Sequence, residues 1–152
     1  MRKTLIIAEA GVNHNGSLKM AEELANEAKE AGADIVKFQT FNPNAITSKY
    51  AQMAQYQREN IGKIKSQKEM LAEFVELARH CQEIGIQFLS TPFDIPSINF
   101  LRSLGCELWK IPSGEITNYP YLIKIAHTGK PVVMSTGMCE PDEILAAINV
   151  LE

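Results

Sequence analysis

Two lysines stand inside short apolar segments, where a charged side chain needs a reason to be present. Lys37 lies in the segment IVKFQT and Lys110 in the segment LWKIP. Burying an ammonium group without a partner is costly. Two such groups that meet at one end of a sheet would bind carboxylate or phosphate oxygens. A lysine paired with a buried glutamate, or one on an edge strand facing solvent, is the alternative for each.

Three hydroxyl side chains follow other apolar segments, at positions suited to anion binding. They are Thr91, Ser113 and Ser135, and each has small or turn-forming neighbours. Hydroxyl groups bind phosphate oxygens together with backbone N–H groups. The same residue types also serve as turn and cap residues, so both roles stay open.

Two glutamates and a glutamine extend this set of polar strand-end residues. Glu115 follows a Ser-Gly turn, where a partly desolvated carboxylate can transfer protons, although it could equally be a solvated loop charge or a helix-entry residue. Glu9 continues the alternating face of the first apolar segment, so we expect it to be buried with hydroxyl or cationic partners. By the same alternation, Gln39 shares a strand face with Lys37.

The histidines and cysteines indicate neither a metal site nor a disulfide framework. His14 lies in the turn-forming stretch NHNG, with no second His or Cys at ligand spacing. The cysteines are odd in number, form no C-x-x-C pair and are expected to be free thiols of a cytoplasmic protein: Cys81, Cys106 and Cys139.

Short apolar segments alternate with helical patterns, which is typical of βα units with a parallel sheet. Each segment is brief and mostly apolar, as expected for strands buried on both faces. The predicted strands are Leu5–Ala8, Ile35–Phe38, Gln87–Leu89, Leu108–Ile111 and Val132–Met134.

Capping residues and glycines mark the helices expected between these strands. Ser66 and Glu69 form an S-x-x-E capping box, and several helical patterns stop at a glycine. The polar stretch from Phe41 to Lys65 is either a lid over a site or a tolerated insertion. The predicted helices run from Leu18 to Ala31, from Ser66 to Gly85, from Asp94 to Gly105, from Asn118 to Gly129 and onward from Pro141.

The composition is that of an ordinary soluble domain. The chain has 152 residues, of which 45% are hydrophobic and 22% charged, and its net charge is −3. This charge argues against a nucleic-acid partner, which would require a basic face. The first apolar run is too short for a signal peptide and 18 apolar residues never occur in succession, so we expect no membrane partner.

Length alone favours a doubly wound sheet, because five βα units do not close an eight-stranded barrel. Five segments in order and spacing reverse this preference, because together they resemble the N-acetylneuraminate (sialic acid) synthase family. These segments are IAEAGVNHNG from Ile7, VKFQT from Val36, LSTPF from Leu89, WKIPSGE from Trp109 and STGM from Ser135.

The resemblance implies an α/β fold of the (β/α)₈ TIM-barrel type, with residues 1–152 forming about the first five βα units as a partial domain. The later strands, with the histidines that bind a divalent metal (Mn²⁺ or Mg²⁺), and a C-terminal antifreeze-like domain would lie outside this chain. No metal ligands are expected within it. Family members form homodimers, and open sheet edges also predict self-association.

The resemblance also implies a transferase of sialic acid biosynthesis that condenses phosphoenolpyruvate with N-acetylmannosamine, giving N-acetylneuraminate and phosphate. By matching position, Lys37 and Thr91 would hold the carboxylate of phosphoenolpyruvate. Its phosphate would lie on Lys110, Ser113 and Ser135. Fixed cationic donors of this kind stabilise the negative charge that the reaction builds.

The remaining matched positions concern catalysis and the acceptor. Glu115 would transfer protons around the tetrahedral intermediate, and Lys110 and Glu9 complete the catalytic set. Glu9 and Gln39 would contact the sugar or a metal-bound water, and Phe93 belongs to the substrate-binding residues.

Two alternatives are kept for this chain. One is a related synthase that makes legionaminate or pseudaminate, because the phosphoenolpyruvate half of the site would be shared. The other is a non-catalytic binding module that associates through its open sheet edges. For a chain of the synthase family, we expect the 152 residues alone to lack synthase activity but to retain part of the phosphoenolpyruvate pocket.

Overall fold

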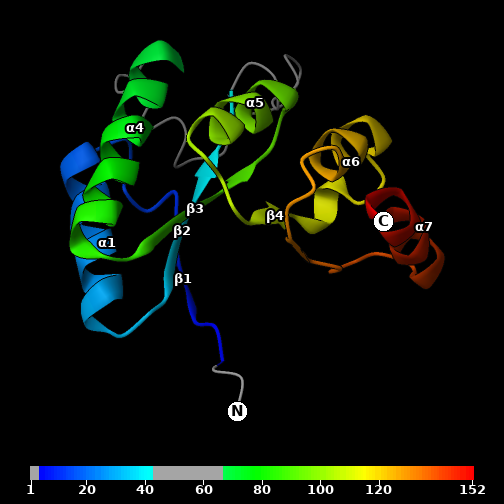
Figure 1. Ribbon diagram of the computed structural model, residues 1–152, viewed down its shortest axis with the longest axis horizontal. Helices are drawn as coiled ribbons and strands as arrows, with labels where there is room; N and C mark the ends of the chain where they lie inside the picture. Colours follow the sequence, from blue (N-terminus) through cyan, green and yellow to red (C-terminus); the bar gives the residue numbers. More distant parts are fainter. Residues whose placement is uncertain (1–3, 43–66) are drawn as a thin grey trace, which may run out of the picture. The chain divides into compact units, whose positions relative to one another are not determined.

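The computed structural model describes residues 4–42 and 67–152, in which strands and helices alternate as predicted (Figure 1). The capping box at Ser66 and the polar stretch, apart from Phe41 and Asn42, lie outside the described residues. In chain order the elements are β1 (Ile7–Gly11), α1 (Leu18–Glu30), β2 (Ile35–Thr40), α4 (Gln67–Ile84), β3 (Gln87–Pro92), α5 (Ile95–Ser103), β4 (Trp109–Ile111), the 3₁₀ helix η2 (Ser113–Glu115), α6 (Tyr119–Ala126), β5 (Val132–Met134) and α7 (Pro141–Leu151).

The described strands form a three-stranded sheet in the order β1-β2-β3 and a two-stranded sheet of β4 and β5. β1 pairs with β2 in parallel, with Ile7 opposite Ile35. β4 pairs with β5 in parallel, with Trp109 opposite Val132. Parallel pairing brings the carboxyl ends of neighbouring strands to the same end of a sheet. The prediction of parallel strands is confirmed for both pairs.

Several predicted strand boundaries were wrong. β1 begins at Ile7 rather than Leu5, whose side chain is 53% exposed. β2 and β3 continue to Thr40 and Pro92, beyond the apolar runs that predicted them. β4 is one residue shorter at its start. Backbone N–H and C=O groups make the ladder, so a strand extends through polar residues wherever a neighbouring strand supplies partners.

The described chain divides into two compact units, of which the first holds residues 4–38 and 67–88. Its helices α1 and α4 lie side by side (Figure 1). α1 presents small buried residues, Ala21, Ala25 and Ala28, that permit close packing. From β2, Phe38 is fully buried, and its ring meets the edge of Phe74 from α4. Apolar burial at these contacts is the main stabilising term of the unit.

The second unit holds residues 39–42 and 89–152, and its largest fully buried side chain is Trp109 of β4. The indole is fully buried, and its Nε1 donates to Thr128 Oγ1 at 2.8 Å. A buried indole N–H requires such an acceptor. α6 contributes buried Leu122 and Ile125, and α7, which lies beside α6 (Figure 1), contributes Ala147.

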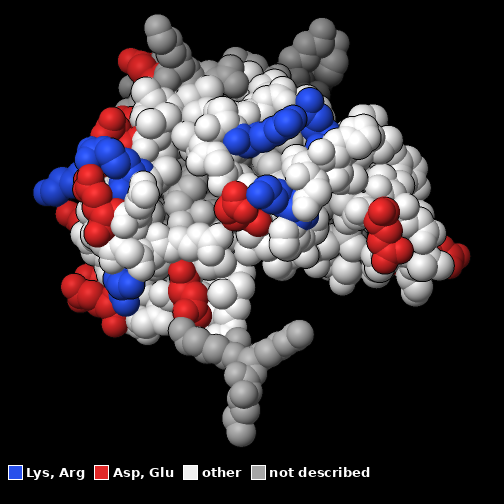
Figure 2. Space-filling model, viewed as in Figure 1, with Lys and Arg blue, Asp and Glu red and all other residues white. Residues whose placement is uncertain are grey.

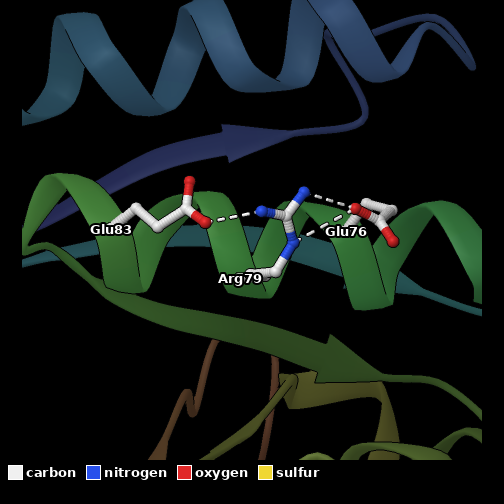
Figure 3. Close-up of polar contacts among 3 residues, drawn as sticks. All are labelled: Glu76, Arg79 and Glu83. Carbon is white, nitrogen blue, oxygen red and sulfur yellow. Dashed lines mark hydrogen bonds and ion pairs between the residues drawn. The ribbon is translucent and has the colours of Figure 1, made fainter.

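The outer face of α4 carries a charged cluster (Figure 3). Arg79 donates to Glu76 Oε2 from Nη2 at 2.6 Å and to Glu83 Oε1 from Nη1 at 2.5 Å. The hydrogen bond that Arg79 donates to Glu76 and the negative charge of Glu83 raise the pKa of Arg79. Basic and acidic side chains alternate over the surface that α1 and α4 form (Figure 2). Exposed pairs of this kind contribute little to stability.

None of the described helices is both long and apolar enough to span a bilayer.

Candidate functional site

Lys110 and Ser135 meet at the carboxyl ends of β4 and β5. Trp109 and Ile111 are fully buried, so the alternation of strand side chains turns the half-buried Lys110 to the opposite face. Its Nζ donates to Ser135 Oγ at 2.6 Å and to the Ile111 carbonyl at 2.6 Å. The Ser135 N–H donates in turn to the Ile111 carbonyl at 3.0 Å, which extends the ladder beyond Met134.

Ser113 lies directly after β4, at the same ends of the two strands. It opens η2, and a Cβ atom added to Gly137 would come within 3.8 Å of its Oγ. The Cys139 Sγ lies 3.5 Å from the Ser113 carbonyl. The structure thus places Ser135 on the ammonium group of Lys110, and Ser113, the third residue expected to bind phosphate, lies in the turn that follows β4. A lysine with nearby hydroxyls is suited to an anionic oxygen ligand.

Lys37 and Glu9 form an ion pair between β2 and β1 in the first unit. They are direct partners in the strand register, and the side chain of Lys37 is 12% exposed whereas that of Glu9 is 52% exposed. The prediction of a buried Glu9 was therefore wrong, because β1 is an end strand of the three-stranded sheet. The expected cationic partner of Glu9 is present, and pairing with a glutamate is the alternative we gave for Lys37.

The other predicted substrate residues lie on β2 and at the end of β3. Gln39 and Lys37 alternate with buried neighbours on β2, so their shared face is confirmed. Thr91 is 2% exposed. Phe93 is half-buried and its ring meets the edge of Phe41, with centroids 6.2 Å apart. Their contacts with a substrate remain predictions.

Glu115 is tied to the start of α6. Its Oε2 accepts from Asn118 Nδ2 at 2.7 Å, and its carbonyl accepts from the Asn118 N–H at 3.0 Å. Asn118 caps α6 by accepting from the Tyr121 N–H at 3.3 Å. The helix-entry alternative for Glu115 therefore describes its contacts in this structure, and proton transfer stays a prediction.

Sequence reasoning missed the residues that hold the end of β3. The Tyr121 hydroxyl donates to the Pro92 carbonyl at 2.8 Å, and burial raises the pKa of Tyr121. A buried hydroxyl pair, Thr40 Oγ1 and Ser90 Oγ, is 2.7 Å apart. The sequence predicted that a helix starts at Asp94, but it did not predict the contact of Asp94 with the end of β2, where its Oδ2 accepts from the Asn42 N–H at 2.6 Å. Such contacts depend on strand pairing and have no local signal.

The two lysines belong to different units, with Lys37 in the first and Lys110 in the second. Their convergence on one ligand therefore stays a prediction.

The three free cysteines agree with the expectation of unpaired thiols.

His14 packs among aromatic rings in the first unit. Its ring meets the edges of Phe38 and Phe74, and its Nδ1 accepts from the Gly16 N–H at 3.2 Å. Between residues 4 and 42 and from 67 to 152, no group of three or more His, Cys, Asp or Glu side chains is placed to hold a metal ion. The residues described do not fit a metal centre.

Comparison with known proteins adds to this geometry. Residues 24–152 match the NeuB family. The chain is 48% identical to the N,N'-diacetyllegionaminic acid synthase of Campylobacter jejuni, covering 99% of this chain and 47% of that protein. It is 49% identical to the synthase of the same name from Legionella pneumophila, covering 97% and 43%.

A solved structure is also similar. It is the N-acetylneuraminic acid (sialic acid) synthetase of Leptospira borgpetersenii in complex with citrate, with a TM-score of 0.84 and 33% identity, covering 99% of this chain and 50% of that one. The chain thus spans about half the length of the relatives it matches.

Proposed function

The chain belongs to the NeuB family, and from this premise we propose that it forms part of a (β/α)₈-barrel synthase that joins phosphoenolpyruvate to an N-acylated amino sugar. The parallel βα units and the likeness to synthases of nonulosonic acids support this proposal. In the reaction C3 of phosphoenolpyruvate bonds to the aldehyde carbon of the acceptor, water adds at C2, and phosphate leaves by C–O cleavage.

The contact between Lys110 and Ser135 carries the proposal. Phosphoenolpyruvate bears a phosphate and a carboxylate, so its site must supply cationic and hydroxyl donors. Lys110 Nζ is already held 2.6 Å from Ser135 Oγ, with Ser113 in the adjoining turn. Donors held in place before binding need no reorganisation when charge develops in the transition state. We assign the phosphate of the donor to these three residues.

The remaining roles follow from the matched positions. Lys37 and Thr91 are proposed to hold the donor carboxylate, and Glu115 to transfer protons around the tetrahedral intermediate. Gln39 is proposed to contact the sugar or a metal-bound water, and Phe93 to be one of the substrate-binding residues. A divalent metal with ligands outside this chain, a homodimer and a cytoplasmic location are further proposals for the whole protein.

The acceptor proposed here carries two acetamido groups. Both relatives named as N,N'-diacetyllegionaminic acid synthases are 48–49% identical to the chain, whereas the sialic acid synthetase is 33% identical. Phosphoenolpyruvate contains no nitrogen, so both nitrogen atoms of a diacetylated product must come from the acceptor. The whole protein should therefore release phosphate faster with a diacetamido sugar than with N-acetylmannosamine. The reverse preference would return the proposal to N-acetylneuraminate synthesis.

Calorimetric titration of the chain with phosphoenolpyruvate tests the donor site. Lys110→Ala is expected to weaken binding at least about tenfold, because it removes a charge-assisted contact to the phosphate. Lys130→Ala is the matched control. Among the contacts described, Lys130 forms a surface ion pair with Glu107, with its Nζ 2.8 Å from Glu107 Oε2. Equal, weak heats for the chain and Lys110→Ala would contradict the proposal and favour a non-catalytic binding module.

A further inference from the structure

The ion pair of Glu9 and Lys37 places a carboxylate of the protein where the carboxylate of a donor is proposed to bind. The two residues are register partners on β1 and β2, and the ammonium of Lys37 contacts Glu9 Oε2. A carboxylate and a lysine ammonium attract each other whether the carboxylate belongs to the protein or to a ligand. Glu9 and an incoming carboxylate therefore compete for the same positive charge.

The two partners differ in how firmly the structure holds them. The side chain of Lys37 is 12% exposed and lies between Val36 and Phe38, both fully buried, so its position is restricted. Glu9 is 52% exposed, on an end strand. A half-exposed carboxylate can be rehydrated when it leaves its partner, whereas a nearly buried ammonium left alone would be costly. Exchange should therefore move Glu9 and leave Lys37 in place.

The backbone next to Glu9 is irregular. The register shifts between Glu9 and Gly11, so that Gly11 rather than Ala10 pairs with Phe38, and Gly11 has a φ of 57°. Such a bulge interrupts the ladder beside Glu9 and re-aims the neighbouring side chains. The ladder that joins β1 to β2 is therefore irregular directly after Glu9.

We propose that Glu9 is an internal counter-ion of Lys37, which the carboxylate of a three-carbon 2-oxo- or 2-enol-acid donor displaces on binding. In this role Glu9 is a positioning residue: it holds the ammonium group of Lys37 in place before the donor binds, and it lowers affinity for the donor by competition. The inference rests on the proposed function, because it assigns the donor carboxylate to Lys37.

The variant Glu9→Gln distinguishes a competing carboxylate from a purely structural ion pair, because the two roles predict different changes in donor affinity. If Glu9 only held Lys37 in place, Glu9→Gln would leave donor affinity unchanged or reduce it. If Glu9 competes with the donor, the same variant keeps a hydrogen-bonding oxygen for Lys37 but removes the competing charge. Affinity should then rise by about three- to tenfold, given the strength of an ion pair that is half-exposed on one side.

The experiment measures binding of three probes to the chain by calorimetry: phosphoenolpyruvate, pyruvate, which has the carboxylate but no phosphate, and inorganic phosphate. Glu9→Gln should tighten the first two by about three- to tenfold and leave phosphate binding nearly unchanged. Glu23→Gln is the matched control, because it removes one carboxylate from an exposed ion pair with Lys19. If circular dichroism shows that Glu9→Gln does not fold, Glu9→Thr replaces it, since threonine favours strands.

The outcomes separate this inference from the proposed function. Binding of phosphoenolpyruvate that weakens with Lys110→Ala but does not tighten with Glu9→Gln would overturn the inference alone. An equal gain for all three probes would also overturn it, because it would indicate a general charge effect. If neither the chain nor Glu9→Gln binds phosphoenolpyruvate, the proposed function fails and the inference fails with it.

Discussion

The two strand lysines have different chemical surroundings, and this difference decides what each can offer to a ligand. Lys110 donates to a hydroxyl and a backbone carbonyl, which are neutral groups. Lys37 is paired with a carboxylate, so part of its charge is already compensated. An anionic ligand gains the full attraction of an ammonium only where no protein carboxylate competes. The availability of Lys37 to an anionic ligand therefore depends on the state of Glu9.

Thiol reactivity gives a prediction at the same scale. Burial raises the pKa of the Cys81 thiol from 9.0 to about 12, whereas Cys139 is half-exposed. In the folded chain at pH 8, a thiol reagent should modify Cys139 quickly and Cys81 only after unfolding, as peptide mass spectrometry would show. Modification of Cys81 as rapid as that of Cys139 would contradict the burial of α4 against its neighbours.

The same shift predicts how stability depends on pH. The folded state favours the protonated thiol of Cys81. The contribution of this thiol to the free energy of unfolding is therefore fully present below the unfolded pKa of 9.0 and is lost as pH rises towards the folded pKa of about 12. Tyr121, whose pKa is also raised, acts in the same direction. Urea titrations should therefore give a lower free energy of unfolding at pH 10.5 than at pH 8. An unchanged value would be inconsistent with these buried groups.

At the scale of elements, helix N-caps fix the segments that follow the strands. Asp94 caps α5 by accepting from the Ser97 N–H at 2.7 Å, and its other oxygen holds the Asn42 N–H that follows β2. Asn118 caps α6. One side chain at the end of β3 thus joins a helix start to the end of a neighbouring strand, whereas Asn118 acts within its own turn and with Glu115.

This difference can be measured by chemical unfolding. Asn118→Ala should lower the free energy of unfolding by about 1 kcal/mol, the usual effect of losing an N-cap. Asp94→Ala should cost about 2–3 kcal/mol, because it also leaves the Asn42 N–H without its charged acceptor. Ser17→Ala, which removes the cap of α1, is the control in the first unit. Equal losses for Asp94→Ala and Asn118→Ala would show that the contact with Asn42 contributes nothing.

At the scale of the whole molecule, apolar side chains remain exposed on the C-terminal elements. Leu145 and Ile148 of α7 are 58% and 38% exposed, and Val133 of β5 is 38% exposed. In the described residues β5 pairs only with β4, so one of its edges has free backbone groups. Exposed apolar area and open strand edges both promote association.

The predicted self-association can be tested at this surface. Light scattering should give a mass that increases with protein concentration, and Leu145→Lys should reduce this increase by placing a charge in the apolar contact. Val75→Lys provides a matched change on α4, where Val75 is 45% exposed, and should have a smaller effect. A monomeric mass at all concentrations would rule out association through this face.

The sequence alone determined the order and type of the elements, because these depend on local rules. Apolar runs, glycine stops and caps such as Asn118 act within a few residues of one another, and they placed Lys110 on its strand and the five helices close to their observed bounds. Only the tertiary structure decided which polar groups meet. Ser135 lies 25 residues from Lys110, and Pro92 lies 29 residues from Tyr121. Such partners depend on strand register and on which strand ends a sheet, so the exposure of Glu9 and its pairing with Lys37 came from the fold.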